Sequence, residues 1–176
     1  MLFRSEQVMS LSVYATTVEL FLPILTNLGN MLAKAKAHAE AKKWDAGVVE
    51  NLRIAPDMFP LKRQVQLATD FAKNSTARLA GIEPPKFPDE EQTLDELVAR
   101  VNKTIDWLRT VTAAQLEGGL QRHIVLPLRT RTLEMDGLPF IQRWALPNFY
   151  FHVTTTYALL REAGVEVGKQ DFLGGV

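Results

Sequence analysis

The feature that most constrains the fold is the run LPNFYFHVTTTYALLREAG at residues 146–164. Its length and very apolar character predict a long buried helix, and Gly164 is typical of the residue that follows a helix C-terminus. Asn148 and His152 lie four residues apart in this run, so a helix places both side chains on the same face. The sequence therefore predicts a polar spot within an otherwise apolar helix.

The composition is that of a soluble globular chain with one domain. Its 176 residues are 47% hydrophobic and 23% charged, which allows a substantial core. Lys plus Arg equals Asp plus Glu at 20 each, and no polybasic tract occurs, so no nucleic-acid partner is expected. The chain has 0 cysteines, which excludes disulfides, cysteine zinc sites and thiol nucleophiles.

No targeting or membrane signal stands out near the N-terminus. The apolar run at residues 20–25 is short, no cleavage motif follows it, and no run approaches the roughly 20 apolar residues of a membrane span. We therefore expect a soluble, cytoplasmic protein with no membrane partner. Residues 1–8 are expected to be an unstructured leader, and residues 9–176 a single helical domain.

Four segments have apolar residues at helical spacing: 12–42, 60–81, 93–108 and 138–164. Pro23 predicts a bend or a break in the first segment, and Asp45 predicts a further short helix up to residue 54. Gly81 is expected to end the second segment. Thr93 and Glu96 have the spacing of a capping box at the start of the third, whose face with Glu96, Arg100 and Lys103 is expected to be solvent-exposed.

Residues 118–140, GGLQRHIVLPLRTRTLEMDGLPF, break the helical period. Apolar and polar residues alternate over 120–127, and a second short strand is expected over 130–135. The pattern predicts a small β-hairpin closed by a turn at Asp136 and Gly137. The fold class is therefore all-α, with a hairpin before the last helix.

The order of His152, the pair Leu160 and Arg161, and Gly164 resembles the closing helix of the DinB/YfiT-like superfamily. The blocks MSLSVYATTVELFL, IAPDMFPLKRQVQLATDFAK, RLAGIEPP and GKQDFLG are similar to one branch of it, a bacterial and fungal family known only as a domain of unknown function. The resemblance extends over nearly the whole chain from Met9. It implies an up-down-down-up four-helix bundle that is often dimeric, and the helical periods agree with this fold independently.

The resemblance also implies a candidate metal site. In the superfamily, one histidine from the second helix and two from the last commonly bind a divalent metal. His152 matches the second histidine of the last helix, Asn148 stands at the first position, and Asp70 falls near the second-helix ligand. Two of the three histidines are therefore replaced, and asparagine is a weak neutral ligand.

Three interpretations of this trio are open. It holds a divalent metal weakly, or it forms a hydrogen-bonded network in which the carboxylate of Asp70 meets the imidazole of His152. In the third interpretation, Asn148 and His152 are ordinary core polar groups. Asp70 then pairs with Lys73 or Lys62.

Four more side chains are candidates to bind a small molecule: Tyr14, Asp57, Gln66 and Tyr157. The two tyrosine hydroxyls are expected to approach the same cavity, and Gln66 shares a helix face with Asp70. Asp57 lies in the segment APDMF at residues 55–59, which is expected to form a rim over the site. The same aspartate also suits a helix cap without any role in binding.

The sequence leaves three functions open. The first is a metal-dependent thiol transferase or isomerase, as found in the wider superfamily. The second is a non-catalytic bundle that binds a small ligand between its helices. The third is an interaction protein that forms a homodimer through an apolar first helix with Leu20, Phe21 and Leu25. Phosphate-binding loops, dinucleotide fingerprints and nucleophile elbows are absent from the sequence.

Overall fold

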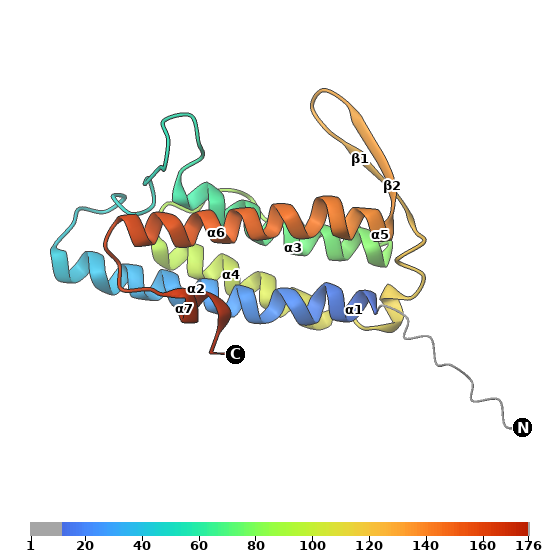
Figure 1. Ribbon diagram of the computed structural model, residues 1–176, viewed down its shortest axis with the longest axis horizontal. Helices are drawn as coiled ribbons and strands as arrows, with labels where there is room; N and C mark the ends of the chain where they lie inside the picture. Colours follow the sequence, from blue (N-terminus) through green and yellow to red (C-terminus); the bar gives the residue numbers. More distant parts are fainter. Residues whose placement is uncertain (1–11, 176) are drawn as a thin grey trace, which may run out of the picture.

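The computed structural model describes residues 12–175, whose long helices form a single bundle (Figure 1). The helices are α1 (Val13–Thr16), α2 (Val18–Lys42), α3 (Leu61–Ala80), α4 (Leu94–Thr110) and α6 (Leu146–Glu162). Helices α2 and α6 run in one direction and α3 and α4 in the other. Helix α3 packs against both α4 and α6, and α2 packs mainly against α4. The predicted up-down-down-up four-helix bundle is confirmed.

Several helix ends follow from local sequence signals. Gly81 ends α3 with a left-handed backbone, φ 70°, and Gly164 follows α6 with φ 80°, conformations that glycine adopts without strain. Thr93 and Glu96 form the predicted capping box at the start of α4, each side chain accepting from the other residue's backbone N–H.

Two predictions for the first third of the chain need correction. The first helix does break, but at Thr17 between α1 and α2 rather than at Pro23, which lies inside α2. A proline leaves only one helical hydrogen bond unmade, and the packed face of α2 keeps the helix continuous. Residues 45–54, predicted as a short helix, form a series of turns instead.

The connection at residues 81–93 is long because it returns to the end of the bundle where α3 began, so α4 runs parallel to α3 (Figure 1). Side chains of both helices hold it in place. The ammonium of Lys73 donates to the carbonyl of Pro85 at 2.6 Å, and the guanidinium of Arg100 donates to that of Pro88 at 2.9 Å.

A short 3-10 turn, η1 (Ala114–Leu116), leads to the hairpin of β1 (His123–Pro127) and β2 (Thr132–Asp136). The strands are antiparallel, with His123 opposite Asp136 and Pro127 opposite Thr132. The hairpin is therefore confirmed, but its turn lies at residues 128–131 and not at Asp136 and Gly137. Asp136 instead precedes the next helix, α5 (Gly137–Phe140). A Cβ on Gly137 would overlap the backbone carbonyl of Gly119, so this contact requires glycine.

The last helix is continuous from α5 through a π-helical segment, η2 (Ile141–Ala145), into α6. Pro147 lies in the first turn of α6 and has no N–H to continue the regular helical bonding. The side-chain amide of Asn148 donates to the carbonyl of Trp144 at 2.7 Å. Asn148 thus satisfies a backbone acceptor at the irregular turn.

The apolar side chains form two cores. The larger fills the bundle, and the smaller lies under the hairpin and includes Ile124, Leu126 and Phe140. Phe21 and Leu25 are fully buried in the larger core, so the apolar first helix is not the exposed dimer patch that the sequence predicted. Dimerisation itself stays a prediction.

At the C-terminus, α7 (Lys169–Leu173) packs against α2, and the ring of Phe172 contacts that of Tyr157 with 6.0 Å between centroids. Within residues 12–175, no helix is both long and apolar enough to cross a membrane. The predicted leader at residues 1–8 lies outside the described residues.

Candidate functional site

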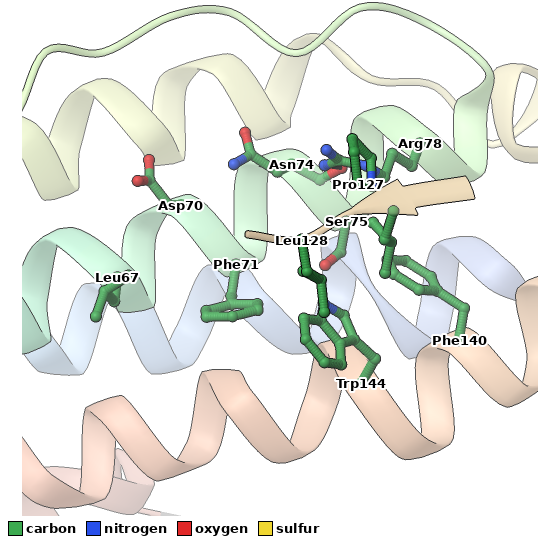
Figure 2. Close-up of a pocket in the computed structure, with 11 residues that line it drawn as sticks. Leu67, Asp70, Phe71, Asn74, Ser75, Arg78, Pro127, Leu128, Phe140 and Trp144 are labelled. Atoms are coloured by element: carbon green, nitrogen blue, oxygen red, sulfur yellow. Dashed lines mark hydrogen bonds between the residues drawn. The ribbon is translucent and has the colours of Figure 1, made fainter. Parts of the chain in front are cut away.

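Asp70 lies on α3 and points away from the last helix (Figure 2). Its Oδ1 atom accepts from Nη2 of Arg100 at 2.9 Å and lies 3.5 Å from the ammonium of Lys73. No hydrogen bond joins Asp70 to His152 among the residues that the structure describes, so the predicted carboxylate–imidazole contact is wrong. The alternative pairing of Asp70 with Lys73 is confirmed.

Arg100 is the centre of the charge cluster that holds Asp70. Its side chain is 1% exposed, although the sequence predicted a solvent-facing position. Its nitrogens donate to the Thr69 hydroxyl, the Pro88 carbonyl and the carboxylates of Asp70 and Glu91, and Nη2 also forms an ion pair with Asp89 at 3.0 Å. Each of the three guanidinium nitrogens therefore contacts a protein acceptor.

His152 lies on α6 and is almost fully buried. Its ring stacks on Phe71 of α3 with 5.5 Å between centroids, and Phe151 packs edge-on against it. Its Nδ1 lies 2.7 Å from Oε1 of Gln64. Burial, together with the positive charge of Arg63, lowers the pKa of His152 to about 4, so the imidazole is neutral at physiological pH.

The hydrogen bonds of Gln64 define the tautomer of His152. The amide nitrogen of Gln64 donates to the carbonyl of Phe59 at 3.0 Å, which leaves Oε1 as the acceptor for the ring. The proton of the neutral imidazole therefore resides on Nδ1, and Nε2 carries the lone pair. The bond to Phe59 also ties the end of the 55–59 segment to Gln64, and the role of this segment as a rim stays a prediction.

The donor set does not fit the predicted metal site. Asp70 is paired with two cations, and the amide of Asn148 is bonded to the backbone of its own helix. Within residues 12–175, no three His, Cys, Asp or Glu side chains are grouped so that they could hold a metal ion. Nε2 of His152 keeps a lone pair without a partner among residues 12–175, and one imidazole is a poor site for a metal.

The four predicted ligand-binding residues are distributed over the molecule. Gln66 is buried beside the Arg100 cluster, where it accepts from Arg63 and donates to Glu91. Tyr14 packs on the smaller core, Tyr157 on the larger core, and Asp57 is exposed in the loop before α3. The structure does not bring these four together, and their roles in binding stay predictions.

A cleft of about 200 Å³ lies where α3, the hairpin and the last helix meet, and strand β1 crosses α3 there (Figure 2). Its walls are mainly apolar: Leu67 and Phe71 of α3, Leu126, Pro127 and Leu128 of the hairpin, and Phe140 and Trp144 of the last helix. Phe71 and Trp144 are 6.2 Å apart between ring centroids. Phe71 therefore separates this cleft from the imidazole of His152.

Polar side chains enter the cleft from one stripe of α3. Asn74, Ser75 and Arg78 follow Phe71 at helical spacing and line the cavity. The Ser75 hydroxyl points toward Trp144 in Figure 2 and forms no hydrogen bond to the described residues, although Ser75 is 2% exposed. Arg78 contacts a backbone carbonyl, that of Asn74, at 3.3 Å, and burial lowers its pKa.

The sequence analysis missed this cleft except for Asp70, which lies at its edge. The spacing of Phe71, Ser75 and Arg78 was a usable signal, because positions i, i+4 and i+7 share one helix face. The contributions of the hairpin and of Trp144 had no such signal. They depend on how distant segments pack together.

The fold and cleft define a four-helix bundle with a hairpin covering one side of the contact between α3 and the last helix. The chain belongs to the family described as "Domain of unknown function (DUF1993)", which matches residues 13–173. It is also similar to a crystal structure of a DinB family member protein from Shewanella denitrificans, with 42% sequence identity and a TM-score of 0.87. That match covers 93% of this chain and 92% of the other. A comparison with curated proteins found no match.

Proposed function

We propose that this protein is a small-ligand-binding bundle whose site is the cleft between α3, the hairpin and the last helix. The observation that carries the proposal is a cleft with aromatic walls, lined also by Ser75 and Arg78, which have no side-chain partners among the described residues. Small-molecule sites typically combine mainly apolar walls with a few polar groups that orient the ligand.

The arrangement of the walls supports a binding role. The floor consists of Phe71 and Phe140, which are anchored by α3 and by the smaller core. The hairpin supplies Leu126 and Leu128 from the opposite side. Because these groups come from three elements of one folded unit, the cleft is preformed and a ligand loses little affinity to reorganisation.

This proposal accounts for the geometry better than metal-dependent thiol chemistry. That chemistry requires Asp70, Asn148 and His152 to converge, and each of them has a different bonded partner. The cleft requires no such convergence. Its polar groups already lie on one stripe of α3.

The three tryptophans provide an internal control for a test. Trp144 lines the cleft, whereas Trp44 and Trp107 are not among its lining residues. A panel of single-ring and short-chain molecules, charged and neutral, would be titrated into ¹⁵N-labelled protein, with the Trp144 indole signal assigned from Trp144→Phe. We expect at least one compound to shift the Trp144 signal in a saturable way while the other two indole signals stay fixed. If no compound does so, or if all three signals move together, the proposal is wrong.

A further inference from the structure

We propose that the cleft selects a small aromatic or apolar carboxylic acid, with its carboxylate paired to Arg78 and its ring against Phe71 and Trp144. This inference rests on the proposed function and adds the chemical class of the ligand. It follows from the charges at the two ends of the cleft, from the hydrogen-bonding capacity between them, and from the size of the space.

The two ends of the cleft differ in charge balance. Asp70 marks one end, where the carboxylates of Asp70, Asp89 and Glu91 are matched by the cations of Arg63, Lys73 and Arg100. Arg78 marks the other end and has no ion pair within the described residues. Glu83 influences its pKa but forms no salt bridge with it. The charge that remains available to a ligand is therefore positive.

The position of Arg78 explains how a half-buried cation is tolerated there. It lies in the last turn of α3, where the helix dipole stabilises positive charge. Arg122 donates to the carbonyl of Leu79 at 2.9 Å, so a second guanidinium caps the helix end while most donors of Arg78 stay unused. A planar guanidinium of this kind suits two-point binding of a carboxylate.

The intervening groups match the rest of such a ligand. The hydroxyl of Ser75 projects into the cleft between the Arg78 end and the ring of Trp144 (Figure 2), where it can donate to a carboxylate oxygen. Phe71 and Trp144 offer ring surfaces to an apolar body. The Cα atom of Asp70 lies eight residues before that of Arg78, about 12 Å along the helix axis, and its carboxylate is paired with Lys73 and Arg100. The charge of Asp70 therefore opposes an acid at Arg78 only weakly.

The size of the cleft limits the ligand to a small one. Its volume of about 200 Å³ is below the roughly 300–1,000 Å³ of sites for drug-sized molecules. A single ring with a short acidic side chain is therefore the expected scale. Phenylacetate, its neutral amide phenylacetamide and the cation phenethylamine are matched probes of that size.

The test compares the affinities of these three probes for the full-length protein, measured by the Trp144 indole shift. We expect phenylacetate to bind about 10- to 100-fold more tightly than phenylacetamide, as is typical of a hydrogen bond to a charged group, and phenethylamine to bind most weakly. Arg78→Gln should reduce the ratio of acid to amide affinity to about one, and Arg78→Lys should retain part of it. Arg109→Gln is the control, because this exposed arginine pairs with Asp106 and neither residue lines the cleft.

The outcomes separate the two proposals. If acid and amide shift the Trp144 signal with equal affinity, or if Arg78→Gln keeps the preference while remaining folded by circular dichroism, the cleft binds ligands but the inference about Arg78 is wrong. If phenethylamine binds most tightly, the charge assignment is wrong. If none of the three probes and no panel compound shifts the Trp144 signal, both the inference and the proposed function fail.

Discussion

The two sides of α3 differ in how completely their polar groups are bonded. On the side facing α4, each guanidinium nitrogen of Arg100 contacts a protein acceptor, and the carboxylates around it are balanced by cations. On the side facing the hairpin, Ser75 and Arg78 have no side-chain partners among residues 12–175. A saturated cluster stabilises the fold, whereas unsatisfied groups in a cleft are available to a ligand. One side of α3 therefore stabilises the bundle, and the other is the side on which we propose ligand binding.

The largest expected loss of stability is on the side of α3 that holds the Arg100 cluster. Arg100→Met leaves three carboxylates and the Thr69 hydroxyl without their shared donor, so we expect a loss of about 3–5 kcal/mol in the free energy of unfolding. Arg100→Lys should recover little of it, because an ammonium has fewer donors and no planar geometry. Urea denaturation measures both variants, with Arg109→Gln as a surface control that should change stability by less than about 0.5 kcal/mol. A loss below about 1 kcal/mol for Arg100→Met would contradict a structural role for the cluster.

The next effect concerns His152 of α6, which packs against Phe71 of α3 and is bonded to Gln64 while neutral. Its pKa is about 4 in the folded protein and about 6.5 in an unfolded chain. Between these values the unfolded state binds the additional proton, so stability is fully present above pH 6.5 and decreases as pH falls toward 4. The expected slope is about 1.4 kcal/mol per pH unit, or roughly 3 kcal/mol in total.

The measurement for His152 is the difference in unfolding free energy between wild type and His152→Gln from pH 7.5 to pH 4. Carboxylate titrations are common to both proteins and cancel in this difference. We expect the wild type to lose stability more steeply than the variant as the pH falls. Parallel curves, or an NMR titration of His152 with a pKa near 6.5, would show that the buried neutral imidazole is misassigned.

The bundle was predictable because its signals are local. Helical periods, the capping box of Thr93 and the terminal glycines Gly81 and Gly164 act over a few residues. The hairpin turn was misplaced because an Asp-Gly pair suits either a turn or the start of a helix, and the contact between Gly137 and Gly119 decides between them. That contact joins segments whose proximity the sequence pattern does not reveal.

The charge cluster around Arg100 was less predictable because it depends on the connection at residues 81–93. This segment has no periodicity, yet it supplies Asp89, Glu91 and the Pro88 carbonyl that surround Arg100. The polar face of an amphipathic helix predicts that Arg100 is exposed to solvent. The side chain is buried because residues 81–93 cover it. Asp70 was correspondingly predicted to meet His152 of the last helix, whereas its carboxylate pairs with Arg100 of α4.

The smallest effect separates the hydroxyls of Thr69 and Ser75, which lie on different faces of α3. Thr69 donates to the carbonyl of Gln66 at 2.7 Å and accepts from Nε of Arg100 at 2.8 Å, so Thr69→Val should cost about 1–3 kcal/mol by leaving a buried donor unpaired. Ser75→Ala removes a hydroxyl with no partner in the described residues and should change stability by less than about 0.5 kcal/mol. Urea denaturation without added ligand compares the two variants. Equal losses of stability would mean that the hydroxyl of Ser75 already stabilises the fold. It would then not be a free polar group for a ligand in the cleft.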